Sequence, residues 1–392
     1  MYIGYSEEQE ALRQELRAYY DDLLSPEIVA ELRKDHGVGE TTRAVVKQMG
    51  ADGWLGIGWP TEYGGQGRSL VEQFLFFDES MKVGAPIPML TVNSVAPTIM
   101  QYGTPEQKEF FLPKILQGEL HFSIGYTEPG AGTDLASLTT RADRDGDEYV
   151  INGQKVFTSL AGDADYVWLA VRTSQDVPKH EGLSLFAVDM KTKGVSSDAM
   201  DLLSDHDIHT TYYDNVRVPA SALVGGENQG WRLITNQLNH ERVTLCAPGM
   251  LEGVYEETLA WARETKRADG RRVIDEEWVQ VNLARVRAGL EFLRLMNWKV
   301  AWTGTQGRLD VADASAMKVF GTEFYMESFR HLMEILGPRG YLLRGSPGSA
   351  VRGHLETLYR GLLILTFGGG TNEVQRDLIG MFGLGLPRAP RF

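Results

Sequence analysis

Apolar residues recur at helical spacing through the first part of the chain. Ser6 can cap a helix, and Gln9, three residues later, completes a capping box. The apolar residues that follow share one face of that helix: Leu12, Leu16, Tyr19, Tyr20 and Leu23. Pro26 starts a second segment. After a glycine-rich connection, helical patterns resume at residues 71–83, 91–102 and 106–117.

The pattern changes near His121, where alternating apolar and polar positions replace the helical spacing. A period of two predicts strands at residues 139–142, 148–151, 155–157, 166–172, 183–189 and 210–218. Asp145-Gly146 and Asn152-Gly153 are typical of hairpin turns, so we expect them to join successive strands. The segment predicts a β domain of roughly a hundred residues, consistent with an antiparallel sandwich or barrel.

Helical spacing returns at Trp231. It covers residues 231–245, 251–265, 275–302, 311–336 and 351–365. Gly337-Pro338 ends the fourth of these segments. Long helices joined by short turns favour a bundle. The pattern therefore predicts an α+β chain with an N-terminal helical domain at 1–121, a central β domain at 122–230 and a C-terminal helical bundle at 231–392.

Composition narrows the compartment and the class of partner. The formal net charge is -14, which disfavours nucleic acid because phosphate binding needs a basic face. The basic residues at 266–272 fit a charged turn between helices better than a binding site. One cysteine, Cys246, excludes an internal disulfide and a cysteine-based metal cage. No apolar run approaches the roughly 20 residues that span a bilayer, and the acidic start is unlike a signal peptide. We expect a cytoplasmic protein with no membrane association and no bound metal.

A single carboxylate interrupts an apolar helical stripe after the β domain. The stripe consists of Ile234, Leu238, Glu241, Leu245 and Pro248, which project from one face. A carboxylate among apolar neighbours loses hydration, so its pKa rises toward neutrality, as a general base requires. From these residues alone the alternative is favoured, namely an ion pair between Glu241 and the adjacent Arg242 or another helix.

Two glycine-rich motifs carry a resemblance to a known family. The first is Tyr126-Thr127-Glu128-Pro129-Gly130-Ala131-Gly132-Thr133-Asp134, and the second, at residues 369–376, is Gly-Gly-Thr-Asn-Glu-Val-Gln-Arg. They resemble the first and the C-terminal signatures of the acyl-CoA dehydrogenases, and the α, β, α order matches that family over essentially the whole chain. Either motif alone would suit a surface loop. Together they imply an acyl-CoA dehydrogenase-like fold with a central antiparallel β domain and a C-terminal four-helix bundle.

The resemblance implies FAD as the cofactor and a thioester of coenzyme A as the substrate. Thr127 would hydrogen-bond the pyrimidine edge of the flavin, with Tyr126 beside it. Gly132 and Thr133 would lie near the pyrophosphate, where exposed backbone N–H groups suit phosphate oxygens. The other residues that would meet FAD are Phe157, Thr158, Ser159, Thr371 and Glu373. The alternative for Phe157 is a place in the core of the β domain.

The resemblance also bears on the catalytic base. Many family members carry the catalytic Glu directly before the Gly-Thr of the C-terminal signature, where this chain has Gly369. A smaller group, resembling isovaleryl- and long-chain-type enzymes, places it before an Arg on the helix after the β domain. Glu241-Arg242 matches that place, so Glu241 is the predicted base for the thioester α-proton. Arg242, with Asn239 as a weaker candidate, would hold the coenzyme A portion.

The glycines at the C-terminal signature bear on the substrate. Gly368, Gly369 and Gly370 remove side-chain bulk from the usual site of the base. The backbone near Gly369 would help to polarise the thioester carbonyl. These glycines favour a wide pocket for a branched or polycyclic acyl group, and the resemblance to a subgroup of steroid side-chain enzymes implies a steroid side-chain thioester as the expected substrate. The alternative is that these glycines only satisfy backbone geometry.

Two turns depart from the homotetramers of the family. Those enzymes present an Arg-x-x-Phe-Gly turn to the FAD of a neighbouring subunit, but this chain has Arg267-Ala268-Asp269-Gly270-Arg271. The segment at 336–340 also departs from the usual Gly-Gly-x-Gly contact. This resembles the actinobacterial heterotetrameric acyl-CoA dehydrogenases of steroid side-chain catabolism and implies an α2β2 assembly with a related chain. Electrons would pass to an electron-transfer flavoprotein. The alternatives are an acyl-CoA oxidase and a non-catalytic structural subunit.

Overall fold

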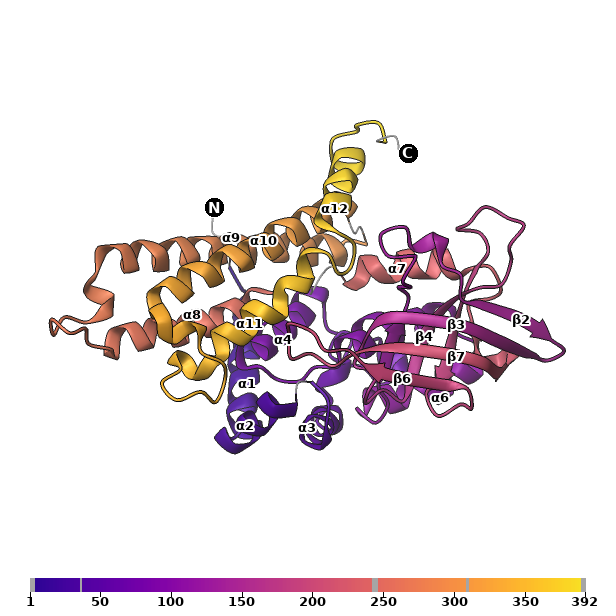
Figure 1. Ribbon diagram of the computed structural model, residues 1–392, viewed down its shortest axis with the longest axis horizontal. Coiled ribbons are helices and arrows are strands. Elements are labelled where there is room, and N and C mark those ends of the chain that lie inside the picture. Colours follow the sequence, from indigo (N-terminus) through magenta and orange to yellow (C-terminus); the bar gives the residue numbers. More distant parts are fainter. Residues whose placement is uncertain (1–3, 36, 242–245, 308–309, 389–392) are drawn as a thin grey trace.

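Helices form both ends of the chain and a β-sheet forms its middle (Figure 1). The computed structural model describes residues 4–35, 37–241, 246–307 and 310–388, and for residues 238–241 the backbone alone. The N-terminal helices are α1 (Glu7–Leu23), α2 (Pro26–Asp35), α3 (Glu40–Ala51), α4 (Leu70–Val83), α5 (Ala96–Tyr102) and α6 (Pro105–Leu116). The capping box at Ser6 is confirmed, and Ser69 and Thr104 form two more. Local capping chemistry therefore sets where these helices begin.

In the described part of the chain, eight strands form one sheet in the order β6-β7-β3-β2-β4-β5-β8, with β1 beside β4. The pairs are antiparallel except β1 with β4 and β2 with β4, which are parallel. The strands are β1 (Phe122–Gly125), β2 (Arg141–Asp145), β3 (Glu148–Ser159), β4 (Tyr166–Arg172), β5 (Leu183–Asp189), β6 (Val195–Ala199), β7 (Ile208–Pro219) and β8 (Leu223–Val224). The predicted central β domain is confirmed, with two parallel pairings that the alternation did not indicate.

One predicted hairpin turn is confirmed and the other is wrong. Asp145 pairs with Glu148, so Asp145-Gly146 does turn the chain from β2 into β3. Asn152-Gly153 lies inside β3, where the register with β7 shifts between Ile151 and Gly153. β7 is long enough to pair with β3 on both sides of this shift. The extra residue lies on β7, where Asn215 has a positive φ of 50°, so β7 bulges opposite Asn152 and β3 continues as one long strand where two short strands were expected.

Both faces of the central strands are buried, because the sheet packs against different elements on each side. Along β4, Val167, Leu169 and Val171 join a core formed within the β domain, whereas Trp168 and Ala170 join a core shared with the N-terminal helices. This split follows the period of two along a strand. The sheet thus fixes the position of the N-terminal helices on one face.

Most of the C-terminal helices pack around a third core, but the first of them does not, because its Leu233 and Ile234 join the core shared with the N-terminal helices. They are α7 (Gly230–Glu241), α8 (Pro248–Glu264), α9 (Glu277–Thr305), α10 (Val311–Leu336), α11 (His354–Leu362) and α12 (Asn372–Leu378). Gly337 ends α10, as predicted. The predicted apolar stripe is wrong at its last member, because Pro248 begins α8 rather than continuing α7. Proline suits the first turn of a helix, where its missing N–H costs nothing.

The N-terminal helices also contact the C-terminal bundle directly. Trp298 Nε1 on α9 donates to Tyr5 Oη at 2.9 Å. Asp78 on α4 is buried and accepts from the backbone N–H of Gly249, at the start of α8, at 2.6 Å. Both ends of the chain therefore share one helical body to the left of the sheet in Figure 1.

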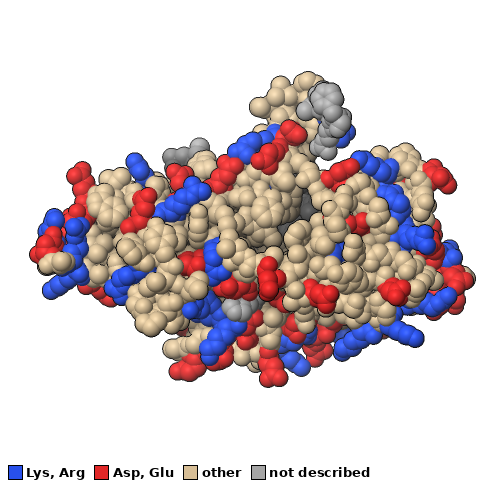
Figure 2. Space-filling model, viewed as in Figure 1, with Lys and Arg blue, Asp and Glu red and all other residues tan. Residues whose placement is uncertain are grey.

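Acidic and basic side chains alternate over the face shown in Figure 2, without a large patch of one sign. The basic residues at 266–272 form the charged turn that was expected, since Lys266 bridges to Arg272 and Arg271 pairs with Asp269 and Glu276. In the ranges given above, no helix is long and apolar enough to cross a bilayer.

Candidate active site

The first signature forms a tight loop directly after β1. Glu128 and Ala131 exchange two backbone hydrogen bonds of 3.0 Å, which closes the turn at Pro129-Gly130. The Glu128 carboxylate accepts from the backbone N–H groups of Thr139 at 2.6 Å and Thr140 at 2.8 Å. One buried side chain therefore ties the start of the loop to the segment that follows it.

A buried ammonium lies under this loop. Lys155 Nζ on β3 donates to Glu128 Oε1 at 2.7 Å and to the Tyr126 carbonyl at 3.2 Å. Burial alone would raise the pKa of Glu128, but Lys155 and the Thr139 N–H lower it to about 2. Burial lowers the pKa of Lys155 to about 8, although the Glu128 carboxylate opposes that shift. The pair holds the backbone of Tyr126 in place.

Phe157 projects from a bulge in β3, at the second irregularity in the pairing of β3 with β7. The register with β7 shifts between Lys155 and Thr158, and Phe157 adopts a positive φ of 58°. Its ring is 54% exposed, so the alternative of a core position is wrong. Val156 N donates to the Thr127 carbonyl at 2.9 Å, which places the bulge beside the signature loop. An exposed ring next to this loop suits stacking by a flat ligand.

The two residues after Phe157 return to regular pairing with β7. The Thr158 side chain is fully buried, and its hydroxyl lies 3.3 Å from that of Thr211. Ser159 pairs with Ile208 and is half-buried. Contact of Thr158 and Ser159 with a flavin stays a prediction.

The glycine end of the signature loop is open. A Cβ on Gly132 would meet nothing within 4 Å, and Thr133 is exposed. Within the described residues, the N–H groups of Gly132 and Thr133 make no backbone hydrogen bond. Free backbone donors on an open loop suit phosphate oxygens.

A buried amide on α7, that of Gln237, hydrogen-bonds Tyr126 of the signature loop. This residue was not identified from the sequence pattern. Gln237 Oε1 accepts from the Tyr126 hydroxyl at 2.6 Å and from Trp168 Nε1 at 3.1 Å. Gln237 Nε2 is buried and has no hydrogen-bond partner among the described residues. The available signal was spacing, because Gln237 lies one turn before Glu241 on the same stripe.

The C-terminal signature forms a turn against α10. Gly369 and Gly370 have positive φ values of 67° and 91°, and a Cβ on Gly370 would lie 2.7 Å from Gln375 Nε2. Thr371 caps α12 by accepting from the backbone N–H of Val374 at 3.3 Å, and Glu373 is exposed. Here the glycines do meet a backbone requirement, so that alternative accounts for at least part of the motif.

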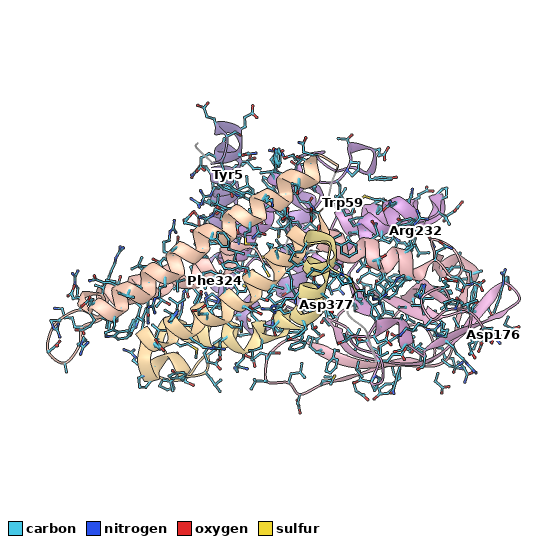
Figure 3. The ribbon with its side chains drawn as sticks, turned by 90° about the horizontal axis from the view of Figure 1, so that it is seen from above. Tyr5, Trp59, Asp176, Arg232, Phe324 and Asp377 are labelled. Atoms are coloured by element: carbon cyan, nitrogen blue, oxygen red, sulfur yellow. The ribbon has the colours of Figure 1, made fainter. Side chains whose placement is uncertain are left out.

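Lys318 on α10 anchors this turn by hydrogen bonds from its side chain. Its buried Nζ donates to the Gly370 carbonyl at 2.8 Å and to Asn372 Oδ1 at 2.7 Å. Its backbone carbonyl lies 3.9 Å from Cys246 Sγ, just before α8. Seen from above, α12 with Asp377 lies between α7, which carries Arg232, and the bundle, which carries Phe324 (Figure 3). The two signatures therefore approach the same junction, each from its own domain.

The predicted base lies at the end of α7. Glu241 is the last described residue of that helix, but its side chain and that of Asn239 lie outside the described residues. Arg242 lies outside them altogether. The roles of these three residues stay predictions. The described groups fit FAD by an exposed ring, an open loop with free N–H groups, and the unpartnered amide of Gln237.

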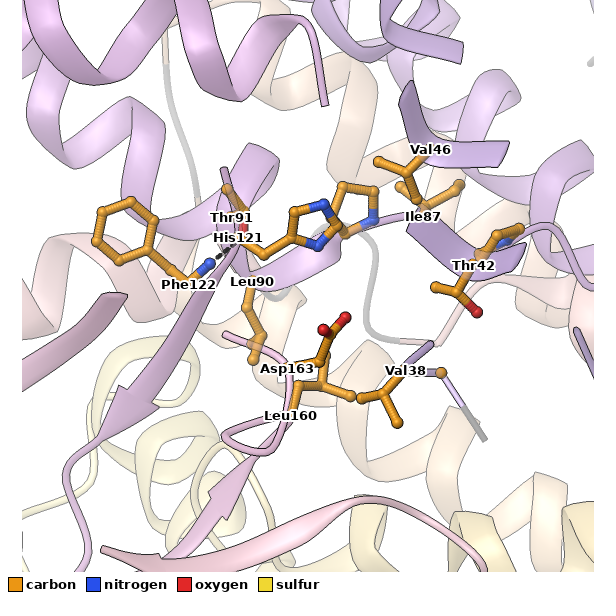
Figure 4. Close-up of a pocket in the computed structure, with 13 residues that line it drawn as sticks. Val38, Thr42, Val46, Ile87, Leu90, Thr91, His121, Phe122, Leu160 and Asp163 are labelled. Carbon is orange, nitrogen blue, oxygen red and sulfur yellow. Dashed lines mark hydrogen bonds between the residues drawn. The ribbon is translucent and has the colours of Figure 1, made fainter. Parts of the chain in front are cut away.

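A small cavity lies beyond the C-terminal end of β3, next to Leu160 (Figure 4). It has a volume of about 120 Å³ and is bordered by His121, Leu160, Asp163 and the 86–91 segment. Thr91 Oγ1 closes one wall by accepting from the Phe122 N–H at 2.9 Å. Sites for small ligands usually enclose about 300–1,000 Å³, so this cavity is too small for a polycyclic acyl group.

Comparison with known proteins covers the whole chain. Residues 6–119 match the family described as acyl-CoA dehydrogenase, N-terminal domain, residues 123–216 the middle domain, and residues 228–384 the C-terminal domain. The chain is 55% identical to acyl-CoA dehydrogenase FadE26 of Mycobacterium tuberculosis over 100% of both proteins. It is 30% identical to the long-chain specific acyl-CoA dehydrogenase of Rattus norvegicus mitochondria, over 96% of this chain and 86% of that protein.

Two solved structures are similar over nearly the full length. A chain of the ChsE4-ChsE5 complex from Mycobacterium tuberculosis is 56% identical, with a TM-score of 0.92 over 99% of this chain and 100% of that one. A chain of the Tcur3481-Tcur3483 steroid ACAD is 49% identical, with a TM-score of 0.94 over 99% of this chain and 100% of that one. Both structures are complexes of two named chains.

Proposed function

Because the chain belongs to the acyl-CoA dehydrogenase family, we propose that it is the base-carrying subunit of a heteromeric enzyme that desaturates a steroid side-chain thioester of coenzyme A. The reaction introduces a trans double bond between Cα and Cβ. One observation carries this proposal: the full-length similarity to a chain of a steroid ACAD, at 49% identity and a TM-score of 0.94.

The residues of this chain would line two sides of one site, one side for the thioester and the other for FAD. On the α7 side, Glu241 would take the Cα proton of the thioester, and Arg242 with Asn239 would hold the coenzyme A portion. On the sheet side, the signature loop, Phe157 and the turn at 369–373 would hold FAD. When bound, FAD supplies the acceptor that takes the Cβ hydrogen as a hydride. The products are the α,β-unsaturated thioester, the protonated Glu241 and the reduced cofactor.

The base needs a desolvated setting to work near neutral pH. Ile234 on the same helix is fully buried, and Gln237 one turn before Glu241 is buried as well. A carboxylate that loses hydration has a raised pKa and becomes a better base for a weakly acidic α-proton. Developing enolate charge would be stabilised by donors around the thioester carbonyl. The backbone near Gly369 is the candidate on this chain.

An exposed apolar surface supports assembly with a second chain. Five large apolar side chains of α9 are between 41% and 59% exposed: Trp278, Val281, Phe292, Leu295 and Trp302. Their spacing follows the heptad pattern of helix-to-helix contacts, so they share one face, the α9 stripe. Arg285 lies on the same face between Val281 and Phe292, so the stripe has two apolar parts. Exposed apolar side chains grouped on one helix face are typical of a protein interface. We propose a related acyl-CoA dehydrogenase chain as the occupant, in an α2β2 assembly.

Electrons would leave through an electron-transfer flavoprotein, in keeping with the family. The test for this step is the acceptor requirement of the assembled enzyme. Turnover is expected only with a protein or artificial acceptor. Stoichiometric hydrogen peroxide at full rate in air would instead favour the oxidase alternative.

The central experiment uses this chain co-expressed with its partner. Anaerobic bleaching of the flavin is measured with a steroid side-chain thioester and with straight-chain thioesters, for the unchanged complex and for Glu241→Gln. The steroid thioester should have the higher kcat/KM, and Glu241→Gln should slow bleaching on the order of a thousandfold or more while FAD stays bound.

Glu264→Gln is the matched control, because Glu264 is an exposed carboxylate at the end of the next helix. It should leave bleaching unchanged. Normal bleaching by Glu241→Gln would eliminate Glu241 as the base and support a non-catalytic role for this subunit. Higher kcat/KM for straight-chain thioesters would refute the steroid substrate.

A further inference from the structure

Gln237 has one orientation in this structure, set by its two neighbours. Its side chain is 1% exposed, and Oε1 accepts from both Tyr126 and Trp168. An indole N–H can only donate, so the amide oxygen must face Trp168. The amide nitrogen, with its two N–H groups, is therefore left on the other side.

These two N–H groups have no acceptor among the described residues. Leaving a buried donor unpaired destabilises the fold, so such a group in a folded protein calls for an explanation. Anchoring α7 does not explain it, because the neighbouring Asn236 Nδ2 already donates to Gln101 Oε1 on α5 at 2.7 Å. What the site lacks is an acceptor oxygen.

The position of Gln237 indicates where such an oxygen would come from. Tyr126 is the first residue of the flavin signature, and Gln237 hydrogen-bonds it from the helix that ends in Glu241. Residues four apart on a helix are neighbours on one face. Gln237 therefore joins the flavin side of the proposed site to its base side.

Resting on the proposed function, we infer that Gln237 is a positioning residue that couples α7 to Tyr126 and donates an amide N–H to a carbonyl oxygen of the bound ligand. Flavin and acyl thioester both carry such oxygens. Because Nε2 is buried, the ligand oxygen reaches it only if a neighbouring group moves aside. Ligand binding and the placement of the base would then depend on each other.

The test uses three variants of the assembled complex. Gln237→Met removes every hydrogen bond of the amide at similar length. Gln237→Glu keeps an oxygen toward Tyr126 and Trp168 and removes both donors. Asn236→Ala is the control, since it loses a hydrogen bond of the same helix on its other side. FAD affinity is titrated on the deflavinated complex, and affinity for a thioester analogue that cannot be oxidised is titrated on the flavin-loaded complex.

Both Gln237 variants should raise one of the two dissociation constants about 5- to 30-fold, with a changed flavin absorbance spectrum, while Asn236→Ala stays within about twofold. Weaker FAD binding identifies the flavin as the source of the oxygen, and weaker binding of the analogue alone identifies the thioester. If both constants stay within twofold in both Gln237 variants, the inference is overturned while the proposed function stands. If the unchanged complex binds neither FAD nor thioester, the proposed function fails and this inference with it.

Discussion

The ion pair of Lys155 and Glu128 is the residue-scale feature that most directly governs the signature loop. Both side chains are buried, at 0% and 5% exposure, and both contact the backbone of the loop or its flanks. Removing one member of a buried pair leaves the other charge uncompensated, which costs about 3–5 kcal/mol. The loop, and any ligand that it holds, should be sensitive to this pair.

Lys155→Met should make flavin retention sensitive to acid. The pKa of Glu128, lowered to about 2 by Lys155 against the effect of burial, is below its ordinary value of 4.5. A carboxylate with a depressed pKa stabilises the fold above its ordinary pKa and loses that contribution as pH falls toward 2. Without Lys155 the pKa of Glu128 rises, so flavin release on acid titration should begin at a higher pH than in the unchanged complex.

Lys179→Met is the control for that titration. Lys179 pairs with Asp134 at the far end of the same loop, at 2.6 Å, but both side chains are more than half exposed. Exposed pairs contribute about 0–1 kcal/mol, so the release profile should not move. An equal shift for both variants would show that the buried pair has no special role.

At the residue scale, the motifs could be recognised in the sequence, but the buried side chains that hold them in place could not. Tyr126, Thr127 and Phe157 lie close together, since Val156 donates to Thr127 beside the Phe157 bulge, and their contact with FAD stays a prediction. Lys155 and Gln237 were missed, because a polar residue in an alternating or helical pattern looks like a solvent-facing position. Only the tertiary contacts show that both are buried under the loop.

At the scale of elements, α4 is the joint between the N-terminal helices and the bundle. Its Asp78 takes the place of a capping residue for α8 by accepting from the Gly249 N–H. Its Glu79 accepts from Arg13 and Arg17 of α1 at 2.6 and 2.9 Å. Two adjacent buried carboxylates therefore attach one helix to elements on either side of it.

Asp78→Asn should stabilise the protein more at pH 8 than at pH 5. Burial raises the pKa of Asp78 to about 7, although the Gly249 N–H and Arg294 oppose the shift. An acid with a raised pKa stabilises the fold while it is protonated, and this contribution is lost as pH rises through about 7. Asparagine keeps the acceptor without the charge, so the gain at pH 8 should be on the order of 2 kcal/mol.

The measurement is the apparent unfolding temperature of the assembled complex at the two pH values. Glu256→Gln is the control, since Glu256 joins the same two helices through Lys82 at 2.8 Å but is 50% exposed. It should change the temperature little at either pH. A loss of stability by Asp78→Asn at pH 8 would mean that the charged form is the one that holds α8.

Element boundaries were predictable where capping or turn chemistry is local. Ser6, Asp145-Gly146 and Gly337 mark true boundaries. Asn152-Gly153 did not, because β7 takes up an extra residue opposite Asn152 and β3 continues through the dipeptide without turning. Pro248 looked like part of the α7 stripe because helical periodicity continues in register across the break between α7 and α8.

For the whole molecule, the α9 stripe is the surface expected to decide assembly. Phe292→Glu combined with Trp302→Glu would place two charges in a desolvated helix contact. Central aromatic residues of interfaces contribute about 2 kcal/mol or more each, so the loss of either one alone should weaken association by at least about 30-fold and the loss of both by more. Size-exclusion chromatography of the co-expressed chains should then show separate subunits in place of one complex.

Gln280→Glu is the control, since it adds a charge to an exposed position of α9 outside the stripe. The complex should survive it. If the doubly substituted chain still elutes with its partner, another surface carries the assembly. Periodicity did not predict which helices pack together across domains. An amphipathic pattern indicates that one face of a helix is buried, but it does not identify the element against which that face packs.

The hydrogen bond between Tyr5 and Trp298 joins residues that are 293 positions apart. On a ribosome that adds about 5–20 residues per second, Trp298 emerges roughly 15 to 60 s after Tyr5. During that interval α1 can form its own backbone hydrogen bonds. The contact between the N-terminal segment and α9 cannot yet form. The N-terminal segment therefore waits through most of synthesis for its contact with α9, which reaches it while the α9 stripe is still uncovered.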